Sequence, residues 1–339
     1  MKNSNWLGKN GPLLIAEIGG NHEGDFTYAK RLTRLAIKSN VDIIKFQIYS
    51  GETLVNNLIS PDRFKHFKKF QLSKKQHIYL AEMCLANGVK YLSSIWDTEV
   101  LKWLDKYLKI YKIGSGDLTA YPIIKEFAKK GKPIILSSGL STSKEIKDTI
   151  NFLVNKNKRY KSKEFLSVLQ CTSSYPTIDQ EANLKTLNHL VKNNNITAGY
   201  SDHTIGSLAL KSAYTLGAQI LEFHFTDTRK NKTFRDHKVS LDLNETKELI
   251  VDLKRIKNLI GTNIKKPTQS EIKSNHLISF RRGIYLNRNI EKGKIIRESD
   301  LVCLRPNIGV DARNYQNIIG RRAKKNIKKL EKLVINKNV

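Results

Sequence analysis

The sequence contains few cysteines, few acidic residues and no long apolar run. Its three cysteines, Cys84, Cys171 and Cys303, stand far apart without a C-x-x-C pair, which argues against a disulfide framework and against a thiolate metal site. No apolar run reaches the length of a membrane span, and residues 1–20 lack the pattern of a secretory signal. We therefore expect a soluble cytoplasmic protein with no membrane partner.

The shortage of acidic residues leaves a large positive charge. The 339 residues include 60 Lys and Arg against 31 Asp and Glu, a formal net charge of +29. Such an excess is typical of nucleic-acid-binding proteins, and the run FKHFKKFQLSKK at 64–75 interleaves lysines with aromatic residues. Runs of this kind are more often solvated loops and helix starts. We therefore expect no nucleic-acid partner, because a basic site for a small anionic substrate explains the charge equally well.

Two motifs are also absent. No G-x-G-x-x-G follows the first predicted strand and no H-E-x-x-H occurs, which argues against a dinucleotide-binding fold and a zinc hydrolase. The chain instead has eight short runs between amphipathic stretches. They are largely apolar rather than alternating, as in strands buried on both faces of a parallel sheet. The runs are LLIAEIG at 13–19, DIIKFQI at 42–48, YLSSIW at 91–96, IYKIGS at 110–115, PIILSSG at 133–139, FLSVLQCT at 165–172, ITAGYSD at 196–202 and ILEFHFT at 220–226.

Eight β-α units within about 260 residues predict an α/β fold of the (β/α)8 TIM-barrel type, with a doubly wound open sheet as the alternative. We expect a TIM-barrel catalytic domain at 1–262 and a polar linker at 263–279. At 280–339, short strands around a Glu-Lys-Gly turn predict a small β-rich domain, too small to bury much core unless it docks on something. The long segment 49–72 after the second strand would lie on the catalytic face of a barrel.

Polar and ionisable side chains collect at the C-terminal ends of the predicted strands, where a barrel carries its catalytic residues. Lys45 and Gln47 are two residues apart on one strand and so share a face, and Lys112 lies in another strand. Two buried lysines would require an anion as partner, so with nearby hydroxyls they indicate a pocket for phosphate, with or without carboxylate. In the alternative, both lysines point outward between strand and helix.

Two histidines follow neighbouring predicted strands, His203 in GYSDHTIGS and His224 in ILEFHFTD. Imidazoles from adjacent strands can share a divalent metal, with Glu17 or Asp236 as an oxygen ligand or as a base. An open site with mixed nitrogen and oxygen ligands suits Mn²⁺ or a similar ion. The alternative is that both histidines are hydrogen-bonded core residues.

These residues lie in motifs that closely resemble those of the N-acetylneuraminate (sialic acid) synthase family. The motifs follow that family's order and spacing over nearly the whole chain: IAEIGGNHEGD, IIKFQIY, YKIGSGDL, ILSSGLST, QCTSSYPT, GYSDHTIG, EFHFT and RDHKVSLD. The C-terminal RRGIYLNRNIEKGKIIRESDLVCLRP resembles the family's antifreeze-like (SAF) domain. The resemblance implies a carbon–carbon bond-forming transferase. It would condense phosphoenolpyruvate with an N-acylated mannose-type sugar to a nonulosonic acid and release phosphate by C–O cleavage.

The resemblance also implies roles for the matching residues. The catalytic residues would be Glu17, His203, His224 and Asp236, and the two histidines would hold a divalent metal, Mn²⁺ or alternatively Mg²⁺ or Co²⁺. Phosphoenolpyruvate would be held by Lys45, Lys112, Ser115, Ser137, Ser173 and Ser201. The sugar would face Gln47, Asp117, Tyr175 and Asp236. In a domain-swapped homodimer, Arg305 would reach the acyl group of the sugar in the partner subunit.

The chain departs from the family's pattern at several points. The family's usual T-P-F-D is Ser94-Ile95-Trp96-Asp97 here, an expected Asn is Ser173, and Arg-Pro-Gly is Arg305-Pro306-Asn307. The segment TFRDHKVS around Asp236 differs too. These changes cluster where the sugar should lie, so a deoxy, diacetamido sugar leading to legionaminic or pseudaminic acid is an alternative to N-acetylmannosamine.

Two rival functions stay open. One is another phosphoenolpyruvate-dependent synthase on the same barrel, which makes a shorter keto-deoxy acid from a sugar phosphate; the SAF-like domain argues against it. The other is a non-catalytic nucleic-acid-binding protein with a degenerate barrel. The intact set of ionisable residues at the strand ends argues against that interpretation.

Overall fold

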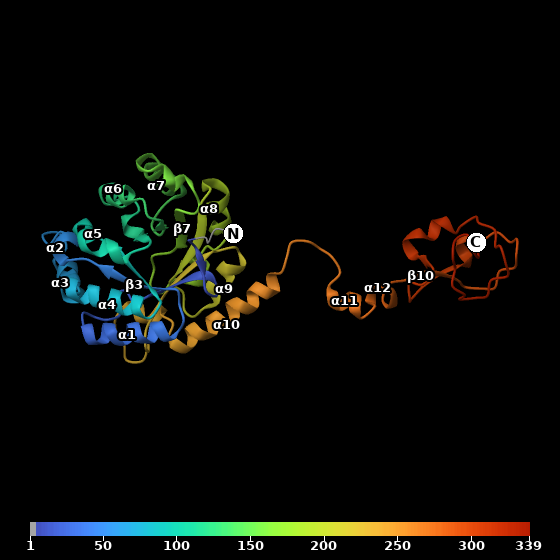
Figure 1. Cartoon of the computed structure of the whole chain (residues 1–339), viewed down its shortest axis with the longest axis horizontal. Coiled ribbons are helices and arrows are strands. Elements are labelled where there is room, and N and C mark those ends of the chain that lie inside the picture. The colour runs from blue at the N-terminus through green and yellow to red at the C-terminus, as the bar shows by residue number, and fades with distance from the viewer. Residues whose placement is uncertain (1–4) are drawn as a thin grey trace. The chain divides into compact units, whose positions relative to one another are not determined.

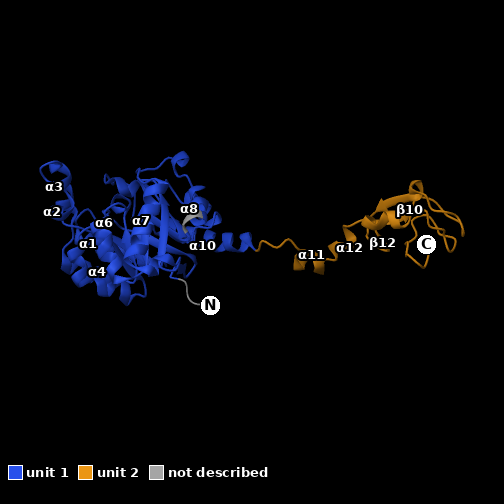
Figure 2. Cartoon of the chain, turned by 90° about the horizontal axis from the view of Figure 1, so that it is seen from above, with its two compact units in different colours: residues 1–261 blue, residues 262–339 orange. Residues whose placement is uncertain are grey.

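The computed structural model describes residues 5–339, and the chain forms two compact units (Figure 2). Residues 1–261 form the first, which we call the barrel unit, and residues 262–339 form the C-terminal unit. Among the residues described, no helix combines the length and the apolar character needed to cross a membrane.

The barrel unit contains eight parallel strands in sequence order, and the first pairs with the last, so the sheet closes on itself. A short strand, β1 (Leu7–Gly8), pairs antiparallel with the first of them. The TIM-barrel prediction is confirmed, and the open-sheet alternative is wrong. The strands are β2 (Gly11–Glu17), β3 (Ile43–Ile48), β4 (Lys90–Ile95), β5 (Tyr111–Ile113), β6 (Ile134–Ser137), β7 (Leu166–Cys171), β8 (Thr197–Asp202) and β9 (Ile220–His224).

Helices surround this barrel (Figure 1). Several begin with a capping box. For example, Thr142 and Glu145 form one at the start of α7 (Ser143–Lys156), and Asp242 and Glu245 form one at the start of α10 (Leu243–Ile260). Two further helices, α2 (Gly51–Leu54) and α3 (Pro61–Phe70), lie in the long segment after β3. The outer helices are α1 (Phe26–Lys38), α4 (Lys74–Ala86), α5 (Leu101–Leu104), α6 (Tyr121–Lys130), α7 (Ser143–Lys156), α8 (Thr186–Asn194), α9 (Leu208–Thr215) and α10 (Leu243–Ile260).

The alternation of side chains along the strands places the candidate site. Successive residues of a strand point to opposite faces, so Leu13, Ile15 and Glu17 of β2 share the inner face. An apolar layer that includes Leu13, Ile15, Ile43 and Ile220 fills the amino-terminal end of the barrel. Further along, Glu17 pairs in register with Lys45 on one side and His224 on the other. The inner face therefore changes from apolar to ionisable toward the carboxyl ends of the strands.

The C-terminal unit is small and built around an antiparallel sheet. Its strands β10 (Gly283–Leu286), β11 (Leu301–Leu304) and β12 (Val310–Asp311) have the order β11-β10-β12, and the short helices α11 (Gln269–Lys273) and α12 (His276–Ser279) precede them. Ile284, Leu286 and Val310 belong to its own apolar core. The predicted β-rich character of this region is confirmed.

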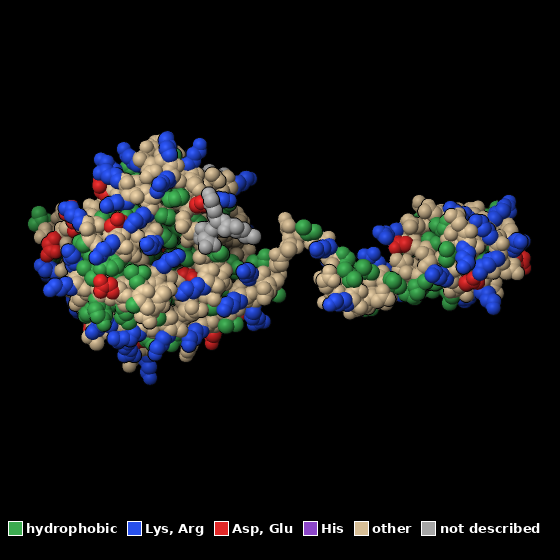
Figure 3. All heavy atoms as spheres, viewed as in Figure 1, with side chains coloured by type: hydrophobic (Ala, Val, Ile, Leu, Met, Phe, Trp, Pro, Cys, Tyr) green, Lys and Arg blue, Asp and Glu red, His purple; other side chains and the backbone are tan. Residues whose placement is uncertain are grey.

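The positive charge is dispersed over the surface. On the face drawn in Figure 3, Lys and Arg side chains are scattered over both units among acidic, apolar and other residues. No continuous basic stripe is visible among the described residues on that face. The excess of Lys and Arg is thus arranged differently there from the clustered basic surface typical of a nucleic-acid-binding domain.

Candidate functional site

A cavity of about 850 Å³ lies at the carboxyl ends of the barrel strands. This is the end of a TIM barrel that carries active sites. Every site residue predicted in the barrel unit lines the cavity: Glu17, Lys45, Gln47, Lys112, Ser115, Asp117, Ser137, Ser173, Tyr175, Ser201, His203, His224 and Asp236. The structure therefore brings these residues together, while their individual roles stay predictions.

Both lysines point into the barrel, so the alternative in which they face outward is wrong. Lys45 and Lys112 are 3% and 2% exposed. The Nζ of Lys112 donates a hydrogen bond of 2.6 Å to the Oγ of Ser137, and the Nζ of Lys45 donates one of 3.4 Å to Ser94. Each ammonium group is thus held by a hydroxyl from the adjacent strand.

The expectation that two buried lysines require an external anion needs correction, because the chain supplies its own carboxylates. Lys45 forms an ion pair with Glu17, and the Nζ of Lys112 lies 3.5 Å from Oε1 of Glu222. Ser201 donates a hydrogen bond of 3.0 Å to the same Glu222 oxygen. Two cations and two anions thus balance each other in the barrel.

Burial and these ion pairs set the protonation of the charged groups. Burial by itself would lower the pKa of Lys45, but Glu17 and Glu222 raise it above the ordinary value. Burial lowers the pKa of Lys112 although Glu222 opposes this. For Glu222 burial acts upward, and Lys112 and Lys45 outweigh it and hold the pKa below its usual range. The carboxylate of Glu222 is therefore kept ionised in an enclosed site.

The two histidines are neighbours in the cavity, with ring centroids 5.3 Å apart. The Nδ1 of His203 lies 2.7 Å from the carbonyl oxygen of Thr172. A carbonyl only accepts, so Nδ1 carries the hydrogen and Nε2 keeps a lone pair. Burial, together with His224, lowers the pKa of His203 to about 3, so this ring is neutral at physiological pH.

Within the described residues, His224, unlike His203, lacks a hydrogen bond at its Nδ1. Its Nδ1 is buried and, among the described residues, has no hydrogen-bond partner; the nearest carboxylate oxygen, Oδ2 of Asp236, is 3.8 Å away. A hydrogen-bonded core histidine does not look like this, so that alternative fails for His224. Imidazole nitrogens without a hydrogen-bond partner suit a divalent cation. Within residues 5–339 no group of three or more His, Cys, Asp and Glu residues is arranged to hold a metal, so the protein would supply two imidazoles.

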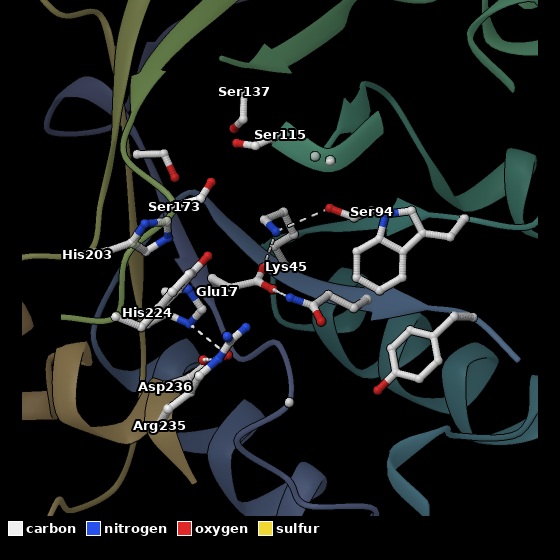
Figure 4. A pocket seen from close by; sticks show the side chains of 18 of the residues that line it. Glu17, Lys45, Ser94, Ser115, Ser137, Ser173, His203, His224, Arg235 and Asp236 are labelled. Carbon is white, nitrogen blue, oxygen red and sulfur yellow. Dashed lines mark hydrogen bonds and ion pairs between the residues drawn. The ribbon is translucent and has the colours of Figure 1, made fainter. Parts of the chain in front are cut away.

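Ser115, Ser137 and Ser173 lie at one end of the cavity in Figure 4, and Arg235 and Asp236 lie at the other, with Lys45 and Glu17 between. The Oγ of Ser115 accepts a hydrogen bond of 3.1 Å from the amide of Gly139. A Cβ atom at Gly139 would lie 2.4 Å from the Oγ of Ser173 and 2.8 Å from that of Ser115. Only glycine fits there, and this leaves two hydroxyls side by side, as an anion-binding pocket requires.

The opposite end of the cavity combines aromatic and charged groups. The ring of Tyr175 lies 4.1 Å from that of His203, and the guanidinium of Arg235 lies 4.4 Å from the Tyr175 ring. Arg235 Nε donates a hydrogen bond of 3.1 Å to Asp236. Near Glu17, the amide of Gln47 donates one of 3.0 Å to the carboxylate. This end can hold a polar, uncharged molecule by hydrogen bonds and ring contacts.

Sequence analysis missed several residues that line the cavity. Glu222 could have been found, because it lies two residues before His224 on one strand and so shares its inner face. The others come from the loops after β3 and β9, where the strand period gives no guidance. They include Tyr49, Arg63, Phe67, Phe234 and Arg235.

Arg305 belongs to the C-terminal unit, where its guanidinium lies 5.5 Å from the ring of Phe280. The two units are described separately, so the proposed contact of Arg305 with a sugar stays a prediction.

Comparisons with known proteins agree with the resemblance. Residues 32–265 match the model of the NeuB family, and residues 281–334 match that of the SAF domain. An uncharacterised protein of Methanocaldococcus jannaschii is 35% identical over 94% of this chain and 92% of its own length. The N,N'-diacetyllegionaminic acid synthase of Legionella pneumophila is 33% identical over 93% and 91%. The crystal structure of a sialic acid synthetase from Leptospira borgpetersenii in complex with citrate is 28% identical. It covers 79% of this chain and 91% of its own, with a TM-score of 0.70.

Proposed function

The chain belongs to the NeuB family of nonulosonic acid synthases, and on this premise we propose that it joins phosphoenolpyruvate to an N-acylated amino sugar and releases phosphate. The observation that carries the proposal is the arrangement of two buried lysines and a set of serines beside two neighbouring imidazoles in one cavity. Lysines and hydroxyls bind carboxylate and phosphate groups, and the imidazoles would hold a divalent cation next to them.

The charge balance of the site supports a metal. Because Glu17 and Glu222 already neutralise the two lysines, a multiply charged anion such as phosphoenolpyruvate needs further positive charge. His203 and His224 would hold Mn²⁺, or alternatively Mg²⁺ or Co²⁺. When bound, the ion would polarise the carbonyl oxygen of the sugar aldehyde.

The residues of the chain divide the remaining work. Lys45, Lys112 and the serines would orient phosphoenolpyruvate so that C3 of the enol faces the aldehyde carbon. A bond forms between these carbons, the former aldehyde oxygen takes up a proton to become a hydroxyl, cationic character develops at C2, and a water molecule adds there. Glu17 accepts one proton from that water, and the C–O bond to phosphate then breaks while the remaining hydroxyl proton leaves with the phosphate, which gives the 2-keto acid. The ion pair with Lys45 would hold the Glu17 carboxylate in place for this step.

For the acceptor, we propose a diacetamido-trideoxyhexose of the legionaminic series. The similarity to a synthase of that name supports this choice, and so do the departures of the sequence around the sugar site. N-acetylmannosamine and the precursor of pseudaminic acid are the alternatives. The free cysteines fit the reducing cytoplasm, where we propose that the protein acts.

The test is phosphate release from phosphoenolpyruvate in the presence of Mn²⁺. The acceptors to compare are diacetamido-trideoxyhexoses, N-acetylmannosamine, and pentose and hexose phosphates. We expect release with an N-acylated, unphosphorylated sugar, and loss of release on chelation. Release only with a sugar phosphate would contradict the proposal and favour the keto-deoxy acid synthase. If no acceptor gives phosphate release and the protein binds nucleic acid tightly in a salt-dependent way, the non-catalytic alternative would be favoured.

We also propose a domain-swapped homodimer in which Arg305 acts in the cavity of the partner subunit. Arg305→Ala should raise the KM for the sugar more than that for phosphoenolpyruvate. Mixing this variant with Lys112→Met, which is defective in the barrel, should restore part of the activity, because one cavity of the mixed dimer then has both residues. A larger rise in the phosphoenolpyruvate KM, or no recovery on mixing, would contradict the swap.

A further inference from the structure

One side of the cavity is aromatic. Tyr49, Phe67 and Trp96 all line it, and we call these three side chains the aromatic wall. The rings of Tyr49 and Trp96 are stacked with centroids 5.3 Å apart, and the ring of Phe67 meets them edge-on at 5.0 and 6.4 Å. Residues from α3 and from the segments after β3 and β4 thus form one continuous apolar surface.

The aromatic wall borders polar groups of the site. A Cβ atom at Gly114 would lie 3.7 Å from Oδ2 of Asp117 and 3.8 Å from Nε1 of Trp96, so both side chains approach the same point. Tyr49 lines the same cavity as Glu17 and Asp236, and the charges of these carboxylates add to burial in raising the pKa of its hydroxyl. The wall therefore shares the cavity with the proposed reaction centre.

The aromatic wall is not simply part of the core. The stacked pair Phe46 and Tyr91, with centroids 5.4 Å apart, is 0% and 2% exposed and lies in the core around the barrel. Phe67 and Trp96 are only half-buried, and their free surface faces the cavity. The proposed chemistry requires charges and hydroxyls and leaves this apolar surface unused.

We propose that the aromatic wall binds the deoxy, methyl-bearing end of the acceptor, and that Trp96 thereby selects trideoxy sugars over N-acetylmannosamine. This inference rests on the proposed function and concerns the acceptor end of the same cavity. A methyl group on an aromatic surface buries apolar area. A hydroxymethyl group in the same place would lose its water without gaining a hydrogen-bond partner.

Trp96 is the residue to test, because it has the largest apolar surface of the three and stands where the family pattern has Phe. With the full chain, kcat/KM is measured for a diacetamido-trideoxyhexose and for N-acetylmannosamine. Trp96→Phe should lower the ratio of the two values about tenfold, the scale on which an apolar pocket separates such sugars. Trp103→Phe is the matched control, because Trp103 packs against the core of the barrel unit and does not line the cavity.

A second variant separates the effect of the apolar surface from that of the proximity of Trp96 to Asp117. Phe67→Leu reduces the aromatic wall and leaves both Trp96 and Asp117 in place, so the ratio should fall in the same direction and by less. An unchanged ratio in both variants, with turnover by the unaltered chain, would overturn the inference and leave the proposed function intact. If the unaltered chain shows no turnover with any acceptor, this would instead contradict the proposed function.

Binding provides a measurement that does not require turnover. Titration of the chain with the trideoxy sugar should change the tryptophan fluorescence, and the change should be absent in Trp96→Phe. A change that persists in Trp96→Phe, or no change in the unaltered chain at saturating sugar, would contradict contact between the sugar and the aromatic wall.

Discussion

The cavity has a strand-borne half and a loop-borne half that differ in how their side chains are held. Lys112 and Glu222 lie on barrel strands, are 2% and 5% exposed, and contact each other inside the barrel. Arg63 comes from α3 and Arg235 from the segment after β9, and both side chains are exposed. The strand-borne half is built into the core, whereas the loop-borne half covers it.

This difference has a consequence for function. A strand residue is fixed by its register with two neighbours, so the strand-borne groups proposed to do the chemistry are held in a fixed geometry. Loop side chains can change without that cost, and loops commonly determine which substrate a barrel accepts. We therefore expect changes in the strand-borne half to affect turnover or stability, and changes in the loop-borne half to affect acceptor choice.

The largest effect should follow the loss of an imidazole. His203→Ala should lower phosphate release by more than about a hundredfold and abolish Mn²⁺ binding, because two imidazoles are the proposed protein ligands. Electron paramagnetic resonance of Mn²⁺ measures binding independently of turnover, and thermal melting should show an intact fold. His276→Ala, in the C-terminal unit, is the control. Undiminished activity of the unaltered chain in metal-depleted buffer would rule out the metal.

The second effect is on stability and tests whether the ion pairs belong to the core. Lys45→Met leaves the buried carboxylate of Glu17 without its partner, which should cost about 3–5 kcal/mol of unfolding free energy. Adding Glu17→Gln removes that unpaired charge and should recover most of the loss. Urea unfolding of the single and double variants measures the coupling between the two residues.

The control for this pair is an ion pair in the loop-borne region. Lys68 and Glu52 are more than half exposed and 3.0 Å apart, so Lys68→Met should lower the unfolding free energy far less than Lys45→Met does. If Lys45→Met and Lys68→Met lower the unfolding free energy by the same amount, the buried ion pair does not contribute to the core as proposed. The two halves of the cavity would then not differ in stability.

The same contrast explains what could be predicted from the sequence. Largely apolar runs located all eight barrel strands, and the period of two along a strand placed Lys45 and Gln47 together on one face. The same period would have found Glu222. The positions of Phe67 and Arg235 depend on how loops pack, for example on the contact of Phe70 with Phe234 at 5.0 Å. No local pattern encodes such contacts, so these residues could not be predicted.

The smallest expected effect concerns Asp117, a loop residue that is partly buried. Burial raises its pKa from the ordinary value of 3.8 to about 6, although Trp96 acts in the opposite direction. Between pH 4 and 6 the folded chain therefore binds more protons than the unfolded chain, so this group's contribution to stability falls as the pH rises through that window. At pH 7.5 the ionised Asp117 destabilises the fold, and Asp117→Asn should raise the unfolding free energy by about 1–2 kcal/mol after allowance for solvent screening.

The gain from Asp117→Asn should shrink to nothing near pH 4, where the carboxyl group is protonated in the folded chain. Melting temperatures of the full chain between pH 4 and 8 measure it. The control is Asp62→Asn in α3, an exposed carboxyl for which burial can have little effect at any pH in this range. A gain of the same size at pH 4 and pH 7.5 would mean that the amide stabilises the loop in some other way. A gain confined to high pH would show that the loop-borne half keeps an ionised carboxylate beside the aromatic wall at the expense of stability, as expected of a group retained to bind a substrate.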